Sequence, residues 1–436
     1  MAATRSDFMS LIPRLPSRTD RLLVTVTGGL LAVSPLLAAL PVLWPGLVGA
    51  TFVTTGGLVW LHRRDVLTMQ DVLGGALLLR LLFLPLLPSL TDDPYRYLWD
   101  GLLQLEGINP YQYVPEADAL HAFREGVLFE RMNSRPYYSI YPPLTQITFA
   151  IGGIGALLDW QVGYYLLKLL FVAAEMGGVV LLSTLTSARN VLLYAWNPLV
   201  LIETAGQGHT EALLVPFVVG LVWAVRRGWG AGASLAVAGA GLVKLYPFVL
   251  WPFLVRRFGL RAVWPGALLI GAVSVPYAAP YVLPHLKASI DLFAELFEFN
   301  AGPYYLVKHT LWAWTGADWS KTIGPAFRAL FLTSLPVLYA ADWWYDWSIR
   351  RAGLWAVGLF LVLSTTVHPW YLVPMLLLAV MDQAPEWPWI WLAAASVGTY
   401  LFYVGGTYWI WIALGWGGAA LLGLWLHWDT LSEART

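Results

Sequence analysis

The sequence predicts an all-α, polytopic membrane protein. Of its 436 residues, 58% are hydrophobic and 12% are charged, whereas a soluble domain carries roughly 25% charged residues. Apolar stretches recur from residue 22 to residue 426, and many of them have the ~20 residues that a helix needs to cross a membrane. We expect one integral-membrane domain over residues 1–436, with about 11–13 transmembrane helices of the length that a bilayer requires.

The composition excludes several other classes of protein. The chain has 26 basic and 26 acidic residues, and this zero net charge does not suggest a nucleic-acid partner. It has no cysteine, which excludes disulfides, thiolate nucleophiles and thiolate-ligated metals. The apolar run that begins at Leu22 is followed closely by a second run, so it is predicted to be an uncleaved span and not a signal peptide.

Arginine pairs predict how the chain is oriented in the membrane. Positively charged residues next to spans favour the cytoplasmic side, so we expect both termini and all of these positions to be cytoplasmic: Arg5, Arg14, Arg18, Arg21, Arg63–Arg64, Arg226–Arg227, Arg256–Arg257 and Arg350–Arg351.

These anchors set the order of the first elements. The spans 22–41 and 43–61 form an N-terminal hairpin within 22–61, and the span 71–90 then runs outward. It delivers Asp92 and Asp93 to the non-cytoplasmic face, where the polar outer loop 91–141 follows.

The remaining membrane helices are expected within residues 142–426. If Arg189 is cytoplasmic, the segments 142–158 and 162–186 cannot both cross, which leaves two alternatives for 142–158: a full span, or a tilted or re-entrant segment. Residues 228–255 lie between two cytoplasmic markers and have arms too short to cross ~30 Å upright, which predicts a short or re-entrant hairpin with Lys244 near its tip. The later segments are a span 262–283, an outer loop 284–321, spans 322–345, 352–367 and 369–381, and a final hairpin 387–426.

The outer loop 91–141 is predicted to be a shaped lid over the membrane. Residues 95–106 have leucines at helical spacing against acidic and amide side chains, which is typical of a helix lying in the interface. Gly107 ends that helix, and residues 119–132 predict a second amphipathic helix.

Several blocks of the chain, in order, resemble a known family. They read "DDPYRYLWDG", "GINPYQY", "YPPL", "WNPLVLIETAGQGHTEALLV", "GLVKLYPFVLWP" and "HPWYLVP". As an ordered set over roughly residues 75–375, they are similar to polyprenol-phosphate-sugar-dependent glycosyltransferases of the GT-C superfamily. The resemblance is closest to the mannosyltransferase branch, which includes the enzyme that adds the first mannose to GPI anchors and bacterial mannan-building enzymes.

The resemblance implies transfer of mannose from a polyprenyl phosphate to an acceptor hydroxyl, usually with inversion, at the outer face of a bacterial inner membrane. The attacking hydroxyl must lose a proton, so one carboxylate serves as general base, whereas the departing lipid phosphate is already a stable anion. Asp93 occupies the position of the family's catalytic Asp, and Asp92 is the alternative base. Either residue could instead be a helix-terminal carboxylate that marks the interface.

Other polar residues are candidates for substrate contacts, each with a structural alternative. Lys244 is the first candidate for the donor phosphate, because a lysine in an apolar hairpin is costly, although it could instead pair with Glu203 or Glu175. Further phosphate candidates are Arg96, which could pair with Asp100 at i,i+4, and His209 and His368, which could be packing residues. Sugar or acceptor contacts are expected from Asp100, Glu211, Tyr141 and Asn109, although Asn109 could simply shape its turn. A buried network of Arg80, Lys168 and Glu175 is expected within the spans.

The expected partners are a lipid-linked sugar donor, a glycan or glycolipid acceptor and membrane lipids. We predict no cofactor and no metal site: a divalent ion is possible at Asp92, Asp93, His209 and Glu211, but no ligand spacing requires one. Two alternative functions remain. One is the same reaction with lipid-linked glucose, arabinose or an amino sugar, and the other is a lipid or glycan transporter, although the repeated halves usual in transporters are not found in the sequence.

Overall fold

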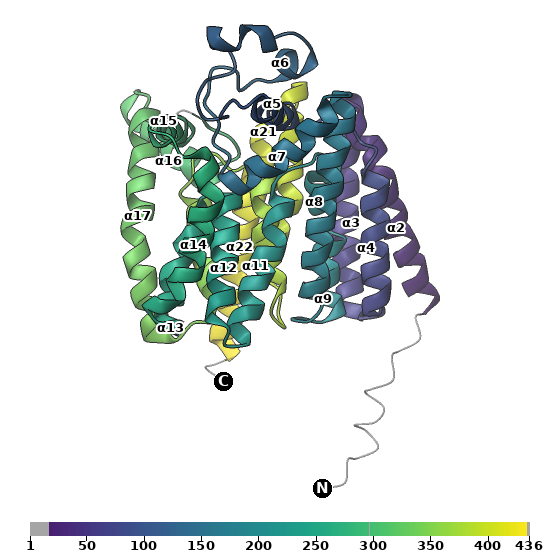
Figure 1. Ribbon diagram of the computed structural model, residues 1–436. Helices are drawn as coiled ribbons and strands as arrows, with labels where there is room; N and C mark the ends of the chain where they lie inside the picture. Colours follow the sequence, from purple (N-terminus) through teal and green to yellow (C-terminus); the bar gives the residue numbers. More distant parts are fainter. Residues whose placement is uncertain (1–16, 296, 434–436) are drawn as a thin grey trace.

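The computed structural model describes residues 17–295 and 297–433. Within these residues the chain is helical and contains no β-strand, only an isolated bridge between Phe299 and Thr366. Figure 1 shows long helices standing side by side, with α5, α6 and the loop around them over one end of the bundle. The predicted all-α polytopic class is therefore confirmed. Arg5 and Arg14 lie outside the described residues.

The first half of the chain supplies one side of the bundle. Helices α2 and α3 form the predicted N-terminal hairpin, and α2 and α4 each begin at a capping box, Ser17 with Asp20 and Thr68 with Asp71. The helices are α2 (Arg18–Ala39), α3 (Trp44–Arg64), α4 (Met69–Phe83), α5 (Asp93–Leu105), α6 (Val127–Arg131), α7 (Pro143–Ala156), α8 (Trp160–Leu182), α9 (Ala188–Ala195), α10 (Pro198–Leu201) and α11 (Glu211–Arg226).

The second half completes the bundle and carries the predicted hairpin around Lys244. That residue follows directly on α12, and the chain then returns through a 3₁₀ turn and α13, which pack against α12. The helices are α12 (Gly230–Val243), α13 (Trp251–Phe258), α14 (Val263–Ser274), α15 (Val282–Glu295), α16 (Gly302–Thr315), α17 (Ser320–Tyr345), α18 (Ile349–Val362), α19 (Val373–Val380), α20 (Trp387–Ser396), α21 (Tyr408–Ile412) and α22 (Gly418–Glu433).

Six helices of the described chain are long and apolar enough to cross a membrane. They are Arg18–Ala39, Pro41–Arg64, Trp160–Leu182, Leu260–Tyr277, Ser320–Tyr345 and Tyr408–His427. A seventh is the pair Pro198–Gly206 and Glu211–Arg226, if this broken helix, bent by 119°, is one span. The sequence-based expectation of about 11–13 spans also counted shorter segments such as 71–90, 352–367 and 369–381. In the structure these regions hold α4, α18 and α19, which have 15, 14 and 8 residues.

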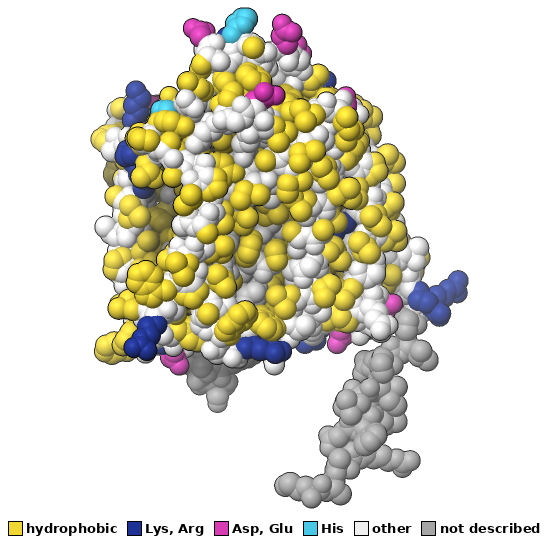
Figure 2. All heavy atoms as spheres, viewed as in Figure 1, with side chains coloured by type: hydrophobic (Ala, Val, Ile, Leu, Met, Phe, Trp, Pro, Cys, Tyr) yellow, Lys and Arg dark blue, Asp and Glu magenta, His cyan; other side chains and the backbone are white. Residues whose placement is uncertain are grey.

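The four arginine pairs lie at the end of the bundle opposite α5 and α6, and Figure 2 shows basic side chains along this end. Arg64 pairs with Asp20 at the start of α2, and Arg226 donates to carbonyls of Leu185 and Met381. The other pairs meet carboxylates at the same end: Arg256 and Arg257 contact Asp342, and Arg350 contacts Asp382. The predicted gathering of the arginine pairs at one end is confirmed.

Helix α5 is more deeply enclosed than an interfacial helix would be. Residues 94–101 are all buried, because α5 packs on α7 beneath the segment 107–141. The crossing of the two helices depends on glycine: a Cβ at Gly101 would lie 2.1 Å from the carbonyl oxygen of Phe149, and a Cβ at Gly153 would meet Gly101. Helix α7 lies inclined in Figure 1 and is not among the six spans, which favours the tilted alternative for 142–158.

Two predictions about outer segments are wrong. Residues 119–132 do not form one amphipathic helix: a 3₁₀ turn, Asp118–Phe123, and the short α6 are separated at Gly126, whose φ of 99° is incompatible with a continuous helix. Residues 284–321 are not a plain loop, because α15 packs against α17 and α16 packs against α17 and α18. The apolar sides of α15 and α16 pack against these neighbouring helices, and this packing stabilises the two segments as helices.

Candidate active site

The two acids lie where the connection from α4 enters α5. This connection is tied to the bundle through its backbone. Lys168 Nζ donates to the carbonyls of Phe83, Leu84 and Leu86 at 3.1, 2.8 and 2.7 Å, and the Gln207 side chain accepts from the amides of residues 89 and 90, both at 2.9 Å. These hydrogen bonds satisfy the carbonyls at the end of α4 and the amides of the connection that follows it. They therefore hold the start of α5 in place.

Asp92 and Asp93 are partly buried and have different partners. Asp92 is the N-cap residue of α5, and its Oδ2 accepts from the backbone amide of Asn133 at 2.8 Å. Asp93 is the first residue of α5, and its Oδ2 accepts from the Tyr97 hydroxyl at 3.2 Å. A negative charge at this helix terminus is favoured by the helix dipole.

Asp92 lies in the connection, outside the membrane-spanning helices. Burial and then the adjacent charge of Asp93 raise the pKa of Asp92 to about 6. Asp92 is therefore mostly protonated below this pH and ionised well above it. Such a pair can present a carboxylate as proton acceptor near neutral pH.

Both acids face a cavity of about 570 Å³. The segment from Asn133 to Tyr141 lines it, and so do Phe299, His368 and Tyr403. Aromatic faces with interspersed hydroxyl, amide and carboxylate groups suit a sugar ring, which presents both apolar C–H faces and hydroxyls.

An aromatic stack forms part of the cavity wall. His368 lies between Phe299, at 4.9 Å between ring centroids, and Trp370, at 4.2 Å. His209 stacks on Trp370 at 3.9 Å, and its Nδ1 lies 3.0 Å from a carboxylate oxygen of Glu203. His368 is therefore placed in the cavity wall, whereas His209 lies behind Trp370 and does not line the cavity.

Arg96 and Asp100 form the i,i+4 ion pair that the sequence allowed. Arg96 Nε donates to Asp100 Oδ1 at 2.7 Å, and its NH1 group donates to the carbonyls of residues 134 and 137. The other Asp100 oxygen accepts from Ser139 Oγ at 2.6 Å and from Gln146 Nε2 at 3.0 Å. Arg96 lines the cavity, but Asp100 is fully buried behind its wall and shapes that wall.

The first part of the chain carries a family signature. The model of the family described as "Alpha-(1->6)-mannopyranosyltransferase, N-terminal domain" matches residues 16–258. The chain belongs to this alpha-(1->6)-mannopyranosyltransferase family. The expected mannosyltransferase branch and the expected enzyme class, a glycosyltransferase, are thereby confirmed.

A curated relative agrees with this assignment. The alpha-(1->6)-mannopyranosyltransferase A of Corynebacterium glutamicum is 22% identical to this chain over 375 residues, which cover 73% of this chain and 72% of the relative. No solved structure matches this mannopyranosyltransferase chain.

Of the remaining predicted site residues, only Tyr141 lines the cavity; Lys244, Glu211 and Asn109 do not. Lys244 pairs with Glu211 at 2.6 Å, not with Glu203 or Glu175, and its Nζ lies 5.1 Å from the ring centre of Tyr371. Tyr141 lines the cavity, whereas the Asn109 side chain donates to the Tyr277 carbonyl and accepts from the Tyr111 amide, as a turn-forming residue does. Within the described chain, no three His, Asp or Glu side chains converge on a possible metal position.

The buried network was predicted in part. Arg80 and Glu175 form a fully buried pair with nitrogen–oxygen distances of 2.9 and 2.7 Å. Lys168 is not a member, because its ammonium caps the carbonyls at the end of α4 and that of Gly206.

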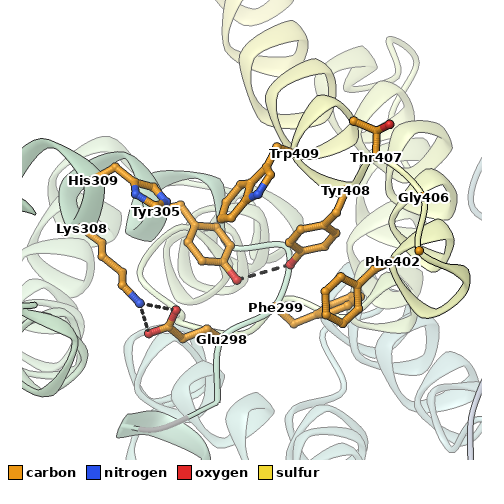
Figure 3. A pocket seen from close by; sticks show the side chains of 11 residues that line it. Glu298, Phe299, Tyr305, Lys308, His309, Phe402, Gly406, Thr407, Tyr408 and Trp409 are labelled. Carbon is orange, nitrogen blue, oxygen red and sulfur yellow. Dashed lines mark hydrogen bonds and ion pairs between the residues drawn. The ribbon is translucent and has the colours of Figure 1, made fainter.

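The sequence reasoning missed a second cavity, of about 550 Å³, drawn in Figure 3. It adjoins the acid-lined cavity, because Glu298, Phe299 and Phe402 line both. Within it Lys308 Nζ contacts both Glu298 carboxylate oxygens at 2.7 Å. The signal was present in "GPYYLVKHTLWAW", where a lysine stands in an apolar helix just as Lys244 does in its hairpin.

The pKa of Asp92 gives a test of which carboxylate is the base. We expect the wild-type rate to fall as pH is lowered through about 6, because protonation of Asp92 removes its negative charge from the acid-lined cavity. Asp92→Asn should retain transfer and lose this inflection in a kcat profile between pH 5 and 8. If Asp92→Asn abolishes transfer at every pH, Asp92 is the base and our assignment of Asp93 is wrong.

Proposed function

We propose that this enzyme transfers mannose from a polyprenyl-phosphate-linked donor to an acceptor hydroxyl of a glycan or glycolipid, at the outer face of a bacterial inner membrane. The observation that carries the proposal is the acid pair at the start of α5, which faces a cavity of sugar size in a member of the mannopyranosyltransferase family. The arginine pairs at the opposite end of the bundle support a cytoplasmic location for that end, as the positive-inside rule requires.

In the proposed reaction, Asp93 accepts the proton of the acceptor hydroxyl while the hydroxyl oxygen attacks the anomeric carbon. The bond from that carbon to the lipid phosphate oxygen breaks, and its electron pair leaves with the phosphate. No general acid is needed, because the leaving group is a stable anion. His368 and Tyr141, which line the cavity, are proposed to bind the mannosyl group.

The linkage follows from the family and the mechanism together. Relatives are named for an α-(1→6)-mannosyl bond, and we propose the same bond here. A single displacement inverts the anomeric centre, so an α-linked product requires a β-linked mannosyl phosphate as donor. This stereochemical relation makes the mechanism testable without a structure of the complex.

The experiment uses purified protein in nanodiscs with an α-1,6-linked mannose oligomer as acceptor. We expect transfer from β-linked polyprenyl-phosphate-[¹⁴C]mannose and none from its α-linked anomer or from polyprenyl-phosphate-glucose, with the product cleaved by an α-1,6-specific mannosidase. Transfer from the α-linked donor would contradict inversion. Transfer from glucose would keep the mechanism and overturn the donor assignment.

A further inference from the structure

Three neighbouring cavities, each sharing lining residues with the next, form a path from the acid-lined cavity to an apolar groove in the helix bundle. The second cavity, around Lys308, shares Tyr305, His309 and Trp409 with a groove of about 880 Å³. The groove runs between α16, α20 and the segment from α21 to α22. From Trp409 to Ala420 this segment rises about 16 Å at 1.5 Å per residue, so the groove is long enough for several carbons of an extended chain.

The chemistry of the path changes along its length. The groove is lined by aliphatic residues and by the rings of Trp389, Trp409 and Trp416. Its mouth carries the polar groups shown in Figure 3: the Lys308–Glu298 pair, His309, and the hydroxyls of Tyr305 and Tyr408 at 3.3 Å from each other. Beyond this mouth lies the cavity with the two acids. The order along the path is therefore apolar, then polar with the Lys308–Glu298 ion pair, then acidic with aromatic walls.

We propose that the groove holds the isoprenoid chain of the donor and that Lys308 and His309 bind its phosphate, with Glu298 holding Lys308 until the donor arrives. This inference rests on the proposed function, because the donor's own order of lipid, phosphate and sugar matches the order of the path. Glu298 lines both the second cavity and the acid-lined cavity. When the donor phosphate replaces Glu298 as the partner of Lys308, it does so at the boundary of the two cavities, where the sugar enters the acid-lined cavity. Lys244, already paired with the buried Glu211, does not line this path.

The Glu298–Lys308 pair gives the first test. Lys308→Met should raise the donor KM by roughly 10–100-fold, the loss expected for a hydrogen-bonded charge, with a much smaller change in kcat. Lys308→Arg should restore most of the affinity, and Glu298→Gln should lower the donor KM because it frees the ammonium. Lys287→Met, which breaks an exposed pair with Asp291 outside the three cavities, is the matched control. Unchanged donor KM in both Lys308→Met and Glu298→Gln would overturn the role of the pair.

The second test narrows the groove with a larger side chain at Ala420, which is not packed in the protein core. Ala420 is exposed and lines the groove, whereas the neighbouring Leu421 is 70% exposed and does not. Ala420→Phe should raise the KM of a long-chain polyprenyl-phosphate-mannose at least several-fold and leave that of a two-isoprene donor unchanged. Leu421→Phe should change neither. Equal KM values for wild type and Ala420→Phe with the long-chain donor would place the lipid elsewhere.

A binding measurement separates this inference from the proposed reaction. Radiolabelled polyprenyl phosphate should bind the purified wild type, lose affinity in Lys308→Met, and resist competition by phosphatidylglycerol and inorganic phosphate. If this binding is found while no lipid-linked mannose is transferred, the groove assignment stands and the proposed reaction fails. If phosphatidylglycerol competes as well as polyprenyl phosphate, the groove is a site for ordinary membrane lipid and the inference is wrong.

Discussion

Asp93→Asn is expected to lower kcat by roughly 10²–10⁴-fold, the contribution of a general base, and to leave the donor KM nearly unchanged. The substitution keeps the size of the side chain and its acceptor oxygen for the Tyr97 hydroxyl, now 3.2 Å from Asp93 Oδ2. It removes only the charge and the ability to take a proton. Because the loss falls on an interaction made in the transition state, it should appear in kcat and kcat/KM alike.

The measurement is label transfer under saturating donor, with binding of polyprenyl phosphate as the check on folding. Asp118→Asn is the matched control, because the Asp118 carboxylate is fully exposed, pairs with Arg124 and does not line the acid-lined cavity. A control with the wild-type rate and an Asp93→Asn protein that binds lipid but does not transfer would establish the base. An Asp93→Asn protein with more than a tenth of the wild-type rate would contradict it.

The strength of the sequence signal differs among the elements of the fold. Hydrophobic length and arginine pairs predicted the helical class, the first hairpin and the gathering of cationic ends, because the bilayer imposes these on any sequence that crosses it. The helices α15 and α16 were missed because they lie within an outer segment with weaker apolar character, where packing against α17 decides the conformation. The break at Gly126 depends on one φ angle, which residue spacing does not encode.

The candidate site shows a similar limit. The family resemblance singled out Asp93, and charge and position singled out Asp92, Arg96 and His368; the structure places all four on one cavity. The same criteria also singled out Lys244, but its contact with Glu211 comes from a helix break that periodicity does not reveal. Lys308 is a candidate only in light of the structure, because its place between Glu298 and the groove depends on the packing of segments far apart in the chain.

The second large effect is expected at the buried pair of Arg80 and Glu175. Both side chains have no exposed surface, and Arg80 NH1 also donates to the carbonyls of Ala76 and Ala195 at 3.0 and 2.9 Å. Arg80→Met leaves the Glu175 carboxylate buried without its counter-charge. Breaking a buried pair in this way costs about 3–5 kcal/mol of stability, so the variant should unfold at a markedly lower temperature or fail to accumulate.

The double variant Arg80→Met with Glu175→Leu distinguishes an uncompensated charge from a simple loss of packing. It removes both charges together, so it should recover most of the thermal stability that Arg80→Met loses, measured as the midpoint of tryptophan fluorescence change in detergent. Arg124→Met, which breaks a pair with the exposed Asp118, should leave the midpoint unchanged. A double variant no more stable than Arg80→Met would mean that the contact of Arg80 with the Ala195 carbonyl, which joins α4 to α9, matters more than its charge partner in α8. In either case the substitutions should change the unfolding midpoint and leave the active site intact, because neither Arg80 nor Glu175 lines the acid-lined cavity.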